Sequence, residues 1–183
     1  MEDTFTLIKQ RKLIKIARQA IEGYLKTGKI QKFETPKELK EKRAVFVTLR
    51  NGEELRGCIG HLEAYKPLAE AVAEMAIAAA VDDNRFLPMT LGELPQIKIE
   101  ISILSPMQKI SDPYQIKLGE HGVMVKNGLR GGTFLPEVAE HFSYNLEEFL
   151  NSLCSHKAGL PTDAWHDPET EIYIFTTQKI KEN

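Results

Sequence analysis

Cysteine is scarce in this sequence, which has only Cys58 and Cys154 among its 183 residues. Two cysteines exclude a disulfide framework and a four-ligand zinc pattern, and they favour reduced thiols. Long apolar runs are also lacking, because the longest, 75–81, is far shorter than the ~20 residues of a membrane-spanning helix. Residues 1–4 lack the basic segment and apolar run of a signal peptide. These absences predict a cytoplasmic protein with no membrane association.

Neither basic nor acidic residues are in large excess. The net charge of −2 excludes a global positive field, so nucleic acid is a poor candidate partner. The sequence has no phosphate-binding glycine loop, dinucleotide fingerprint, nucleophile elbow or three-cysteine cluster. Its histidines lack metal-ligand spacing, so we expect no metal and no cofactor. The 42% hydrophobic content is enough for a packed core in one domain or two small ones.

Apolar spacing predicts an amphipathic helix over residues 7–25 that stops near Gly28. A β-rich run at 44–49 leads to Asn51-Gly52, a dipeptide that suits the positive φ angles of a tight hairpin turn. The return strand carries residues 55–60. An N-terminal helix and a hairpin therefore open the fold.

A second helix is predicted to begin at Pro67 and to run to about Val81. Residues 97–104 alternate strictly and predict a strand that buries its four isoleucines and exposes Lys98 and Glu100.

The second half repeats this order. Residues 123–131 match residues 47–57 if two extra glutamates are allowed in the first hairpin. Asn145, with Glu148 three residues later, predicts a capping box at the start of a helix, and 172–175 predict a last strand. We interpret the pattern as an internal duplication, which would make Arg56 and Arg130 equivalent residues beside a glycine.

Seven motifs, in order along the chain, resemble the AMMECR1 domain family. One departure is Tyr144, where the family pattern has tryptophan. The motifs are Leu55-Arg56-Gly57-Cys58-Ile59-Gly60, Asp83-Asn84-Arg85-Phe86-Leu87-Pro88, Ile101-Ser102-Ile103-Leu104, Gly119-Glu120-His121-Gly122, Phe134-Leu135-Pro136-Glu137-Val138, Phe149-Leu150, and Lys157-Ala158-Gly159-Leu160 with Trp165.

The resemblance implies an α+β fold in which two related β-rich repeats with helices form a single barrel-like sheet, read as a larger and a smaller subdomain. The domain would span residues 6–180, with repeats at 44–104 and 114–177 and an N-terminal helix at 6–27. It also implies Memo-like and radical SAM proteins as partners. It brings no established reaction.

Cys58 is the sharpest candidate site residue. Gly57 and Gly60 leave the backbone open to a ligand, and strand alternation puts Arg56 and Cys58 on one face. Arg56 and His61 would favour the thiolate form of a nearby cysteine. The competing interpretation is a small, buried cysteine in a strand.

Asp83 and Arg85 follow the second predicted helix, and we expect them to return to the end of the Cys58 strand. A carboxylate beside a guanidinium orients a polar substrate or sets a proton-transfer group, whereas the plain alternative is a surface ion pair. Glu120 and Arg130 are further candidates for substrate binding.

Two functional hypotheses follow. In the first, the protein is an enzyme or catalytic accessory with Cys58, Arg56 and Asp83 as catalytic residues. Its cleft between the repeats would bind substrate through the remaining candidates, Arg85, Gly57, Gly60, Glu120 and Arg130. In the second, the 55–60 motif shapes the groove of a non-catalytic scaffold that binds a small molecule or a protein.

Overall fold

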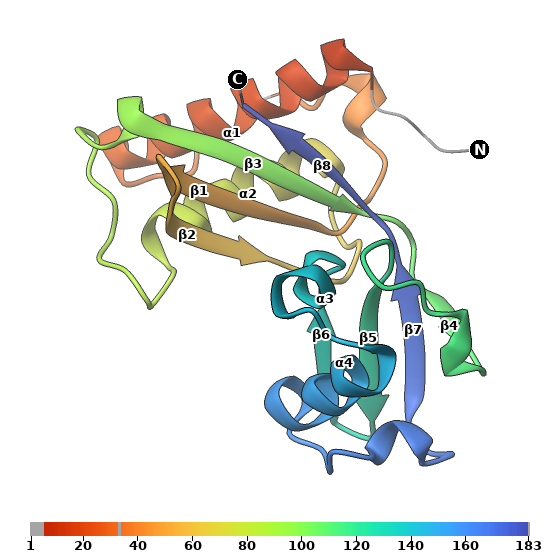
Figure 1. Ribbon diagram of the computed structural model, residues 1–183. Helices are drawn as coiled ribbons and strands as arrows, with labels where there is room; N and C mark the ends of the chain where they lie inside the picture. Colours follow the sequence, from red (N-terminus) through yellow and green to blue (C-terminus); the bar gives the residue numbers. More distant parts are fainter. Residues whose placement is uncertain (1–5, 33, 183) are drawn as a thin grey trace. The chain divides into compact units, whose positions relative to one another are not determined.

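The computed structural model describes residues 6–32 and 34–182 (Figure 1). Residues 1–4, from which the absence of a signal peptide was predicted, lie outside the described residues. The chain divides into two compact units. The first contains the chain up to Leu104 and the segment from Gln178 onward, and the second is Ser105–Thr177. Across the described ranges no helix is long and apolar enough to cross a membrane.

The first unit is an antiparallel four-stranded sheet in the order β2-β1-β3-β8. Two helices cover one face of the sheet, and Figure 1 shows both on the same side. The core lies between the helices and that face. The elements are α1 (Leu7–Thr27), the short 3₁₀ turn η1 (Lys37–Leu39), β1 (Val45–Asn51), β2 (Glu54–Gly60), α2 (Leu68–Val81), the 3₁₀ turn η2 (Leu94–Gln96), β3 (Ile97–Leu104) and β8 (Thr177–Lys181).

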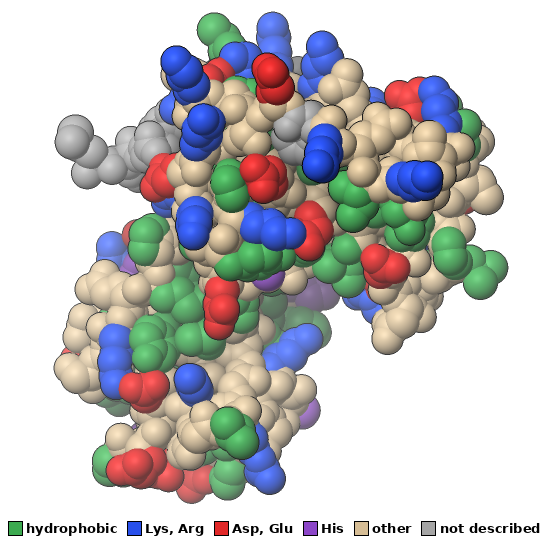
Figure 2. All heavy atoms as spheres, turned by 180° about the vertical axis from the view of Figure 1, so that it is seen from behind, with side chains coloured by type: hydrophobic (Ala, Val, Ile, Leu, Met, Phe, Trp, Pro, Cys, Tyr) green, Lys and Arg blue, Asp and Glu red, His purple; other side chains and the backbone are tan. Residues whose placement is uncertain are grey.

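Helix α1 forms as its sequence predicts. Leu13, Ala17 and Ile21 make the buried stripe, and Gly28 ends the helix in the left-handed conformation with a φ of +67°. The Gly28 N–H donates to the Tyr24 carbonyl at 2.7 Å, which satisfies one of the last carbonyls of the helix. Figure 2 shows Lys and Arg side chains interspersed with acidic ones over this unit.

Strand β3 confirms the predicted alternation on its core side. Ile97, Ile99, Ile101 and Ile103 are all buried and Lys98 is exposed. The expectation that Glu100 is exposed was wrong, because its side chain is only 14% exposed between Arg50 and Lys181. Two cations on neighbouring strands screen this carboxylate from water.

The second unit has its own antiparallel sheet in the order β4-β7-β5-β6. Asn145 and Glu148 form the predicted capping box, which starts α4. That helix continues into a π-helical turn, η4, that packs against β6. The elements are β4 (Gln108–Ile110), η3 (Pro113–Gln115), β5 (Gly122–Asn127), β6 (Arg130–Phe134), α3 (Glu137–Phe142), α4 (Leu146–Ser152), η4 (Leu153–Ala158), η5 (Ala164–His166) and β7 (Glu171–Phe175).

The two sheets share one arrangement of strands. The first strand of each hairpin lies between its hairpin partner and a later strand: β1 between β2 and β3, and β5 between β6 and β7. The described strands form two separate sheets and no closed barrel, so the single barrel-like sheet is not confirmed. Internal duplication, with repeats at 44–104 and 114–177, stays a prediction.

Candidate functional site

Strand β2 contains a β-bulge at Arg56. Leu49 pairs with Gly57 but Arg50 pairs with Leu55, so Arg56 is the extra residue. A bulge redirects a side chain and interrupts simple alternation. The expectation that the Arg56 and Cys58 side chains lie on one face of the sheet assumed regular alternation, which the bulge interrupts.

The Arg56 guanidinium contacts the segment after α2. Its Nε donates to Glu93 Oε2 at 2.9 Å and its Nη2 to the Leu87 carbonyl at 2.9 Å. Glu93 also accepts from the N–H and hydroxyl of Thr90, and with Arg56 these donors lower the pKa of Glu93 to about 2. Arg56 Nη1 is buried without a hydrogen-bond partner among the described residues.

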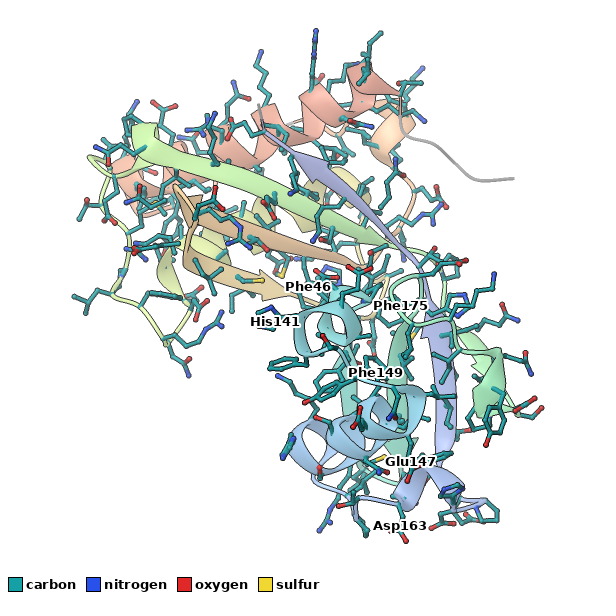
Figure 3. All side chains as sticks on the ribbon, viewed as in Figure 1. Phe46, His141, Glu147, Phe149, Asp163 and Phe175 are labelled. Carbon is teal, nitrogen blue, oxygen red and sulfur yellow. The ribbon has the colours of Figure 1, made fainter. Side chains whose placement is uncertain are left out.

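The two glycines of the motif have packing roles. A Cβ on Gly57 would lie 2.0 Å from the Ala79 carbonyl oxygen, so only glycine lets α2 approach β2 this closely. A Cβ on Gly60 would lie 2.2 Å from Cγ of Phe46, which Figure 3 labels on β1. The space that the sequence predicted for a ligand beside these glycines is therefore filled by α2 and by the Phe46 ring.

Cys58 lies on the sheet face opposite α1 and α2. Its cross-strand partner is Thr48, which alternates with the core residues Val47 and Leu49. Cys58 Sγ lies 3.2 Å from Thr48 Oγ1, and the cysteine is partly exposed. It is therefore not the fully buried cysteine of the competing interpretation.

Asp83 and Arg85 together hold the outer edge of β2 at Cys58. Asp83 Oδ2 accepts the Cys58 backbone N–H at 2.8 Å, and Arg85 Nη2 donates to the Cys58 carbonyl at 3.4 Å. The two side chains also pair directly, through Nε–Oδ1 at 2.9 Å and Nη2–Oδ2 at 2.7 Å. An ion pair thus makes the contacts that a neighbouring strand would make with this residue.

The electrostatics of this pair follow from its geometry. The Asp83 side chain is 3% exposed and that of Arg85 is 53% exposed. Hydrogen bonds from Arg85, and then from the backbone N–H groups of Cys58 and Arg85, hold the pKa of Asp83 well below its usual range despite its burial. The hydrogen bonds to Asp83 likewise raise the pKa of Arg85. The Arg85 guanidinium therefore lies at the backbone carbonyl of Cys58.

Phe86 joins the two arginines of the site. Its ring centroid lies 5.8 Å from Cζ of Arg56 and 5.6 Å from Cζ of Arg85. Sequence reasoning missed Phe86, Glu93 and Thr48 as members of the group. Glu93 lies 37 residues from Arg56 along the chain, so no local motif indicated their contact, whereas the hairpin register was the available signal for Thr48.

The remaining candidates make other contacts. His61 Nδ1 is 2.7 Å from the Glu63 carbonyl and its ring packs on Tyr65, so it does not assist Cys58 through a hydrogen bond. Glu120 pairs with Lys117, and Arg130 donates to the Gly159 carbonyl. Both Glu120 and Arg130 belong to the second unit. Within the described ranges, no three His, Cys, Asp or Glu side chains are grouped to hold a metal ion.

Known proteins match nearly the whole chain. The sequence model of the AMMECR1 family matches residues 14–180. Protein MK0488 of Methanopyrus kandleri is 44% identical over 192 residues, which cover 100% of this chain and 92% of that protein. Protein PYRAB00100 of Pyrococcus abyssi is 43% identical, with 93% and 88% covered. The crystal structure described as uncharacterized protein PH0010 from Pyrococcus horikoshii superposes with a TM-score of 0.86 at 42% identity, covering 94% of this chain and 90% of that one.

Proposed function

The chain belongs to the AMMECR1 family, and from that premise we propose that it is an enzyme or catalytic accessory whose reactive group is the Cys58 thiol. Asp83 accepts the Cys58 backbone N–H, and Arg85 provides a half-exposed cation at the Cys58 carbonyl. We further propose, from the family resemblance, that it acts with Memo-like and radical SAM partners.

The observation that carries this proposal is the double contact of Asp83 and Arg85 with the backbone of Cys58. These bonds hold the residue from its N–H and its carbonyl, while the thiol faces away from the helices. A neighbouring cation favours the thiolate, which is the nucleophilic form of cysteine. Arg85 can also bind an anionic group of a substrate, because a guanidinium has donors beyond those that Asp83 uses.

The test is the pH dependence of iodoacetamide labelling of the native protein, followed by mass spectrometry at each cysteine. Cys154 is an internal control, because it is fully buried and burial raises its pKa. We expect Cys58 to react well below the pH of about 8.5 at which ordinary thiols ionise. Arg85→Gln should move the profile to higher pH, and Arg85→Lys, which keeps the charge, should move it less.

The alternative function is a non-catalytic scaffold that binds a small molecule or a protein. It is favoured by the packing roles of Gly57 and Gly60 and by the way the Asp83–Arg85 pair completes the edge of β2. Labelling of Cys58 only at ordinary thiol pH, unchanged in Arg85→Gln, would contradict the catalytic proposal and leave the scaffold. Cys58→Ser should keep its fold under either function, because the residue is partly exposed.

A further inference from the structure

The second unit contains a hollow of about 760 Å³ at the turn of the β5–β6 hairpin. Figure 3 labels Asp163, one of its lining residues, at the end of this unit. All residues that line the hollow belong to Ser105–Thr177, so the inference drawn from it does not rest on the function proposed for Cys58. Its size is within the range of small-molecule sites. Its lining includes Asn127, Leu129, Arg130, Leu160, Asp163 and Asp167.

Two charged groups of the hollow have hydrogen-bond partners within the unit. Arg130 Nη1 donates to the Gly159 carbonyl at 3.0 Å, and Gly159 has a φ of +63°, which favours glycine. Asp167 Oδ1 accepts the Glu169 N–H at 2.9 Å, and its Oδ2 lies 3.5 Å from Asn127 Nδ2. Because these contacts restrict the two side chains before a ligand arrives, less ordering is needed on binding.

The hollow also presents both signs of charge without an ion pair. Among the described residues, the salt bridges include none of Arg130, Asp163 and Asp167, whereas Arg18, Arg56 and Arg85 each pair with a carboxylate. A zwitterion would complement both signs at once. Neither a simple anion nor a simple cation would do so.

The apolar lining of the hollow consists of Leu129, Leu160, Pro161 and Ala164. Leu129, at the hairpin turn, is fully exposed with a relative exposure of 106%, and Leu160 is partly buried beside the hollow. We propose that this hollow binds a free amino acid with an apolar side chain. Arg130 would bind its carboxylate, Asp163 and Asp167 its ammonium group, and the two leucines its side chain.

The experiment is calorimetric titration of the full chain with leucine and two analogues. Leucinamide lacks the carboxylate, and 4-methylpentanoate lacks the ammonium group. We expect leucine to bind at least about tenfold more tightly than either analogue, because each analogue leaves one charged group of the hollow unpaired. Arg130→Gln and Asp167→Asn should each weaken leucine binding by at least about tenfold.

Arg11→Gln on α1 is the matched control, because Arg11 is exposed and does not line the hollow; it should bind leucine like the wild type. Asp163→Asn gives a second acidic variant if Asp167→Asn folds poorly. Absence of leucine binding up to its solubility limit would overturn the proposal. So would equal binding of leucinamide, or leucine binding unchanged in both Arg130→Gln and Asp167→Asn. None of these outcomes bears on the labelling of Cys58.

Discussion

The β1–β2 hairpin of the first unit and the β5–β6 hairpin of the second turn in the same way. Only the glycine of each Asn-Gly pair has a positive φ, +60° at Gly52 and +58° at Gly128, while the asparagine is the last residue of its strand. Gly57 lies opposite Leu49, and Gly132 lies opposite Val125. Each of these two glycines faces the backbone of a following helix, α2 or η4.

The two hairpins differ by one residue, the bulge at Arg56. Arg56 has no counterpart in β6, and Arg130 lies beside the turn opposite Asn127. The predicted equivalence of Arg56 and Arg130 was therefore wrong, and the register instead aligns Gly57 with Gly132. The inserted residue of the first unit, Arg56, directs its side chain to Glu93. In the second unit, whose hairpin lacks the insertion, Arg130 lies at the hollow.

The largest loss of stability is expected from a side chain at Gly57, where α2 packs directly on the strand. Gly57→Ala would put a Cβ 2.0 Å from the Ala79 carbonyl oxygen, so the helix must move away from the sheet. We expect a loss of at least about 4 kcal/mol in the free energy of unfolding, which is among the largest for a single substitution. Urea unfolding followed by circular dichroism measures it.

The same comparison predicts an intermediate loss for Gly132→Ala, whose Cβ would lie 2.6 Å from the Ala158 backbone nitrogen. Gly92→Ala is the control, because nothing lies within 4 Å of its Cβ position and its φ is not positive. A Gly57→Ala protein as stable as Gly92→Ala would show that α2 does not pack on β2 as described.

The next prediction compares how the stability that each hairpin contributes depends on pH. Asp83 and Arg85 hold the edge of β2, whereas β6 packs against η4. Asp83→Asn should cost about 2 kcal/mol at pH 7, because the substitution breaks the ion pair and weakens the bond to the Cys58 N–H.

The sign of the pH dependence follows from the lowered pKa of Asp83. Its stabilising contribution is present above the unfolded-state pKa of about 3.9 and is lost as the pH falls from there through the folded-state pKa. The difference between wild type and Asp83→Asn should therefore be constant from pH 7 to 5 and shrink below about pH 4. The cost of Gly132→Ala should not change over this range. A pH-independent cost of Asp83→Asn would contradict the ion-pair account.

Much of the fold was predictable because its signals are local. The α1 stripe, the Gly28 stop and the Asn145 capping box depend on residues within a few positions of each other. The β3 alternation was read correctly for its isoleucines, but Glu100 was misread because its cations come from β1 and β8. Ion pairs between residues far apart in the sequence cannot be recognised from a local residue pattern.

The candidate site likewise has contacts that the sequence predicted and contacts that it did not. The return of Asp83 and Arg85 to Cys58 was expected from the short connection after α2. The bulge was not, because Leu55-Arg56-Gly57 matches Leu129-Arg130-Gly131 by residue type while the hydrogen-bond register aligns other positions. The Glu93 partner of Arg56 lies 37 residues away along the chain, beyond the reach of any motif.

The smallest expected effect tests whether the two turns are alike. Gly52→Ala and Gly128→Ala each place a side chain in the left-handed region, and no atom lies within 4 Å of either Cβ position. Backbone strain is then the only cost, and each variant should lose about 1 kcal/mol, since that is the penalty of a non-glycine residue in this conformation. Gly52→Asn and Gly128→Asn should lose less, because asparagine tolerates positive φ better than alanine does. Urea unfolding of all four variants measures these costs, and the two positions should give equal values for the same substitution. A clear inequality between Gly52→Ala and Gly128→Ala would show that the turns differ in backbone strain, and that the likeness of the hairpins is limited to the glycines packed against the helices.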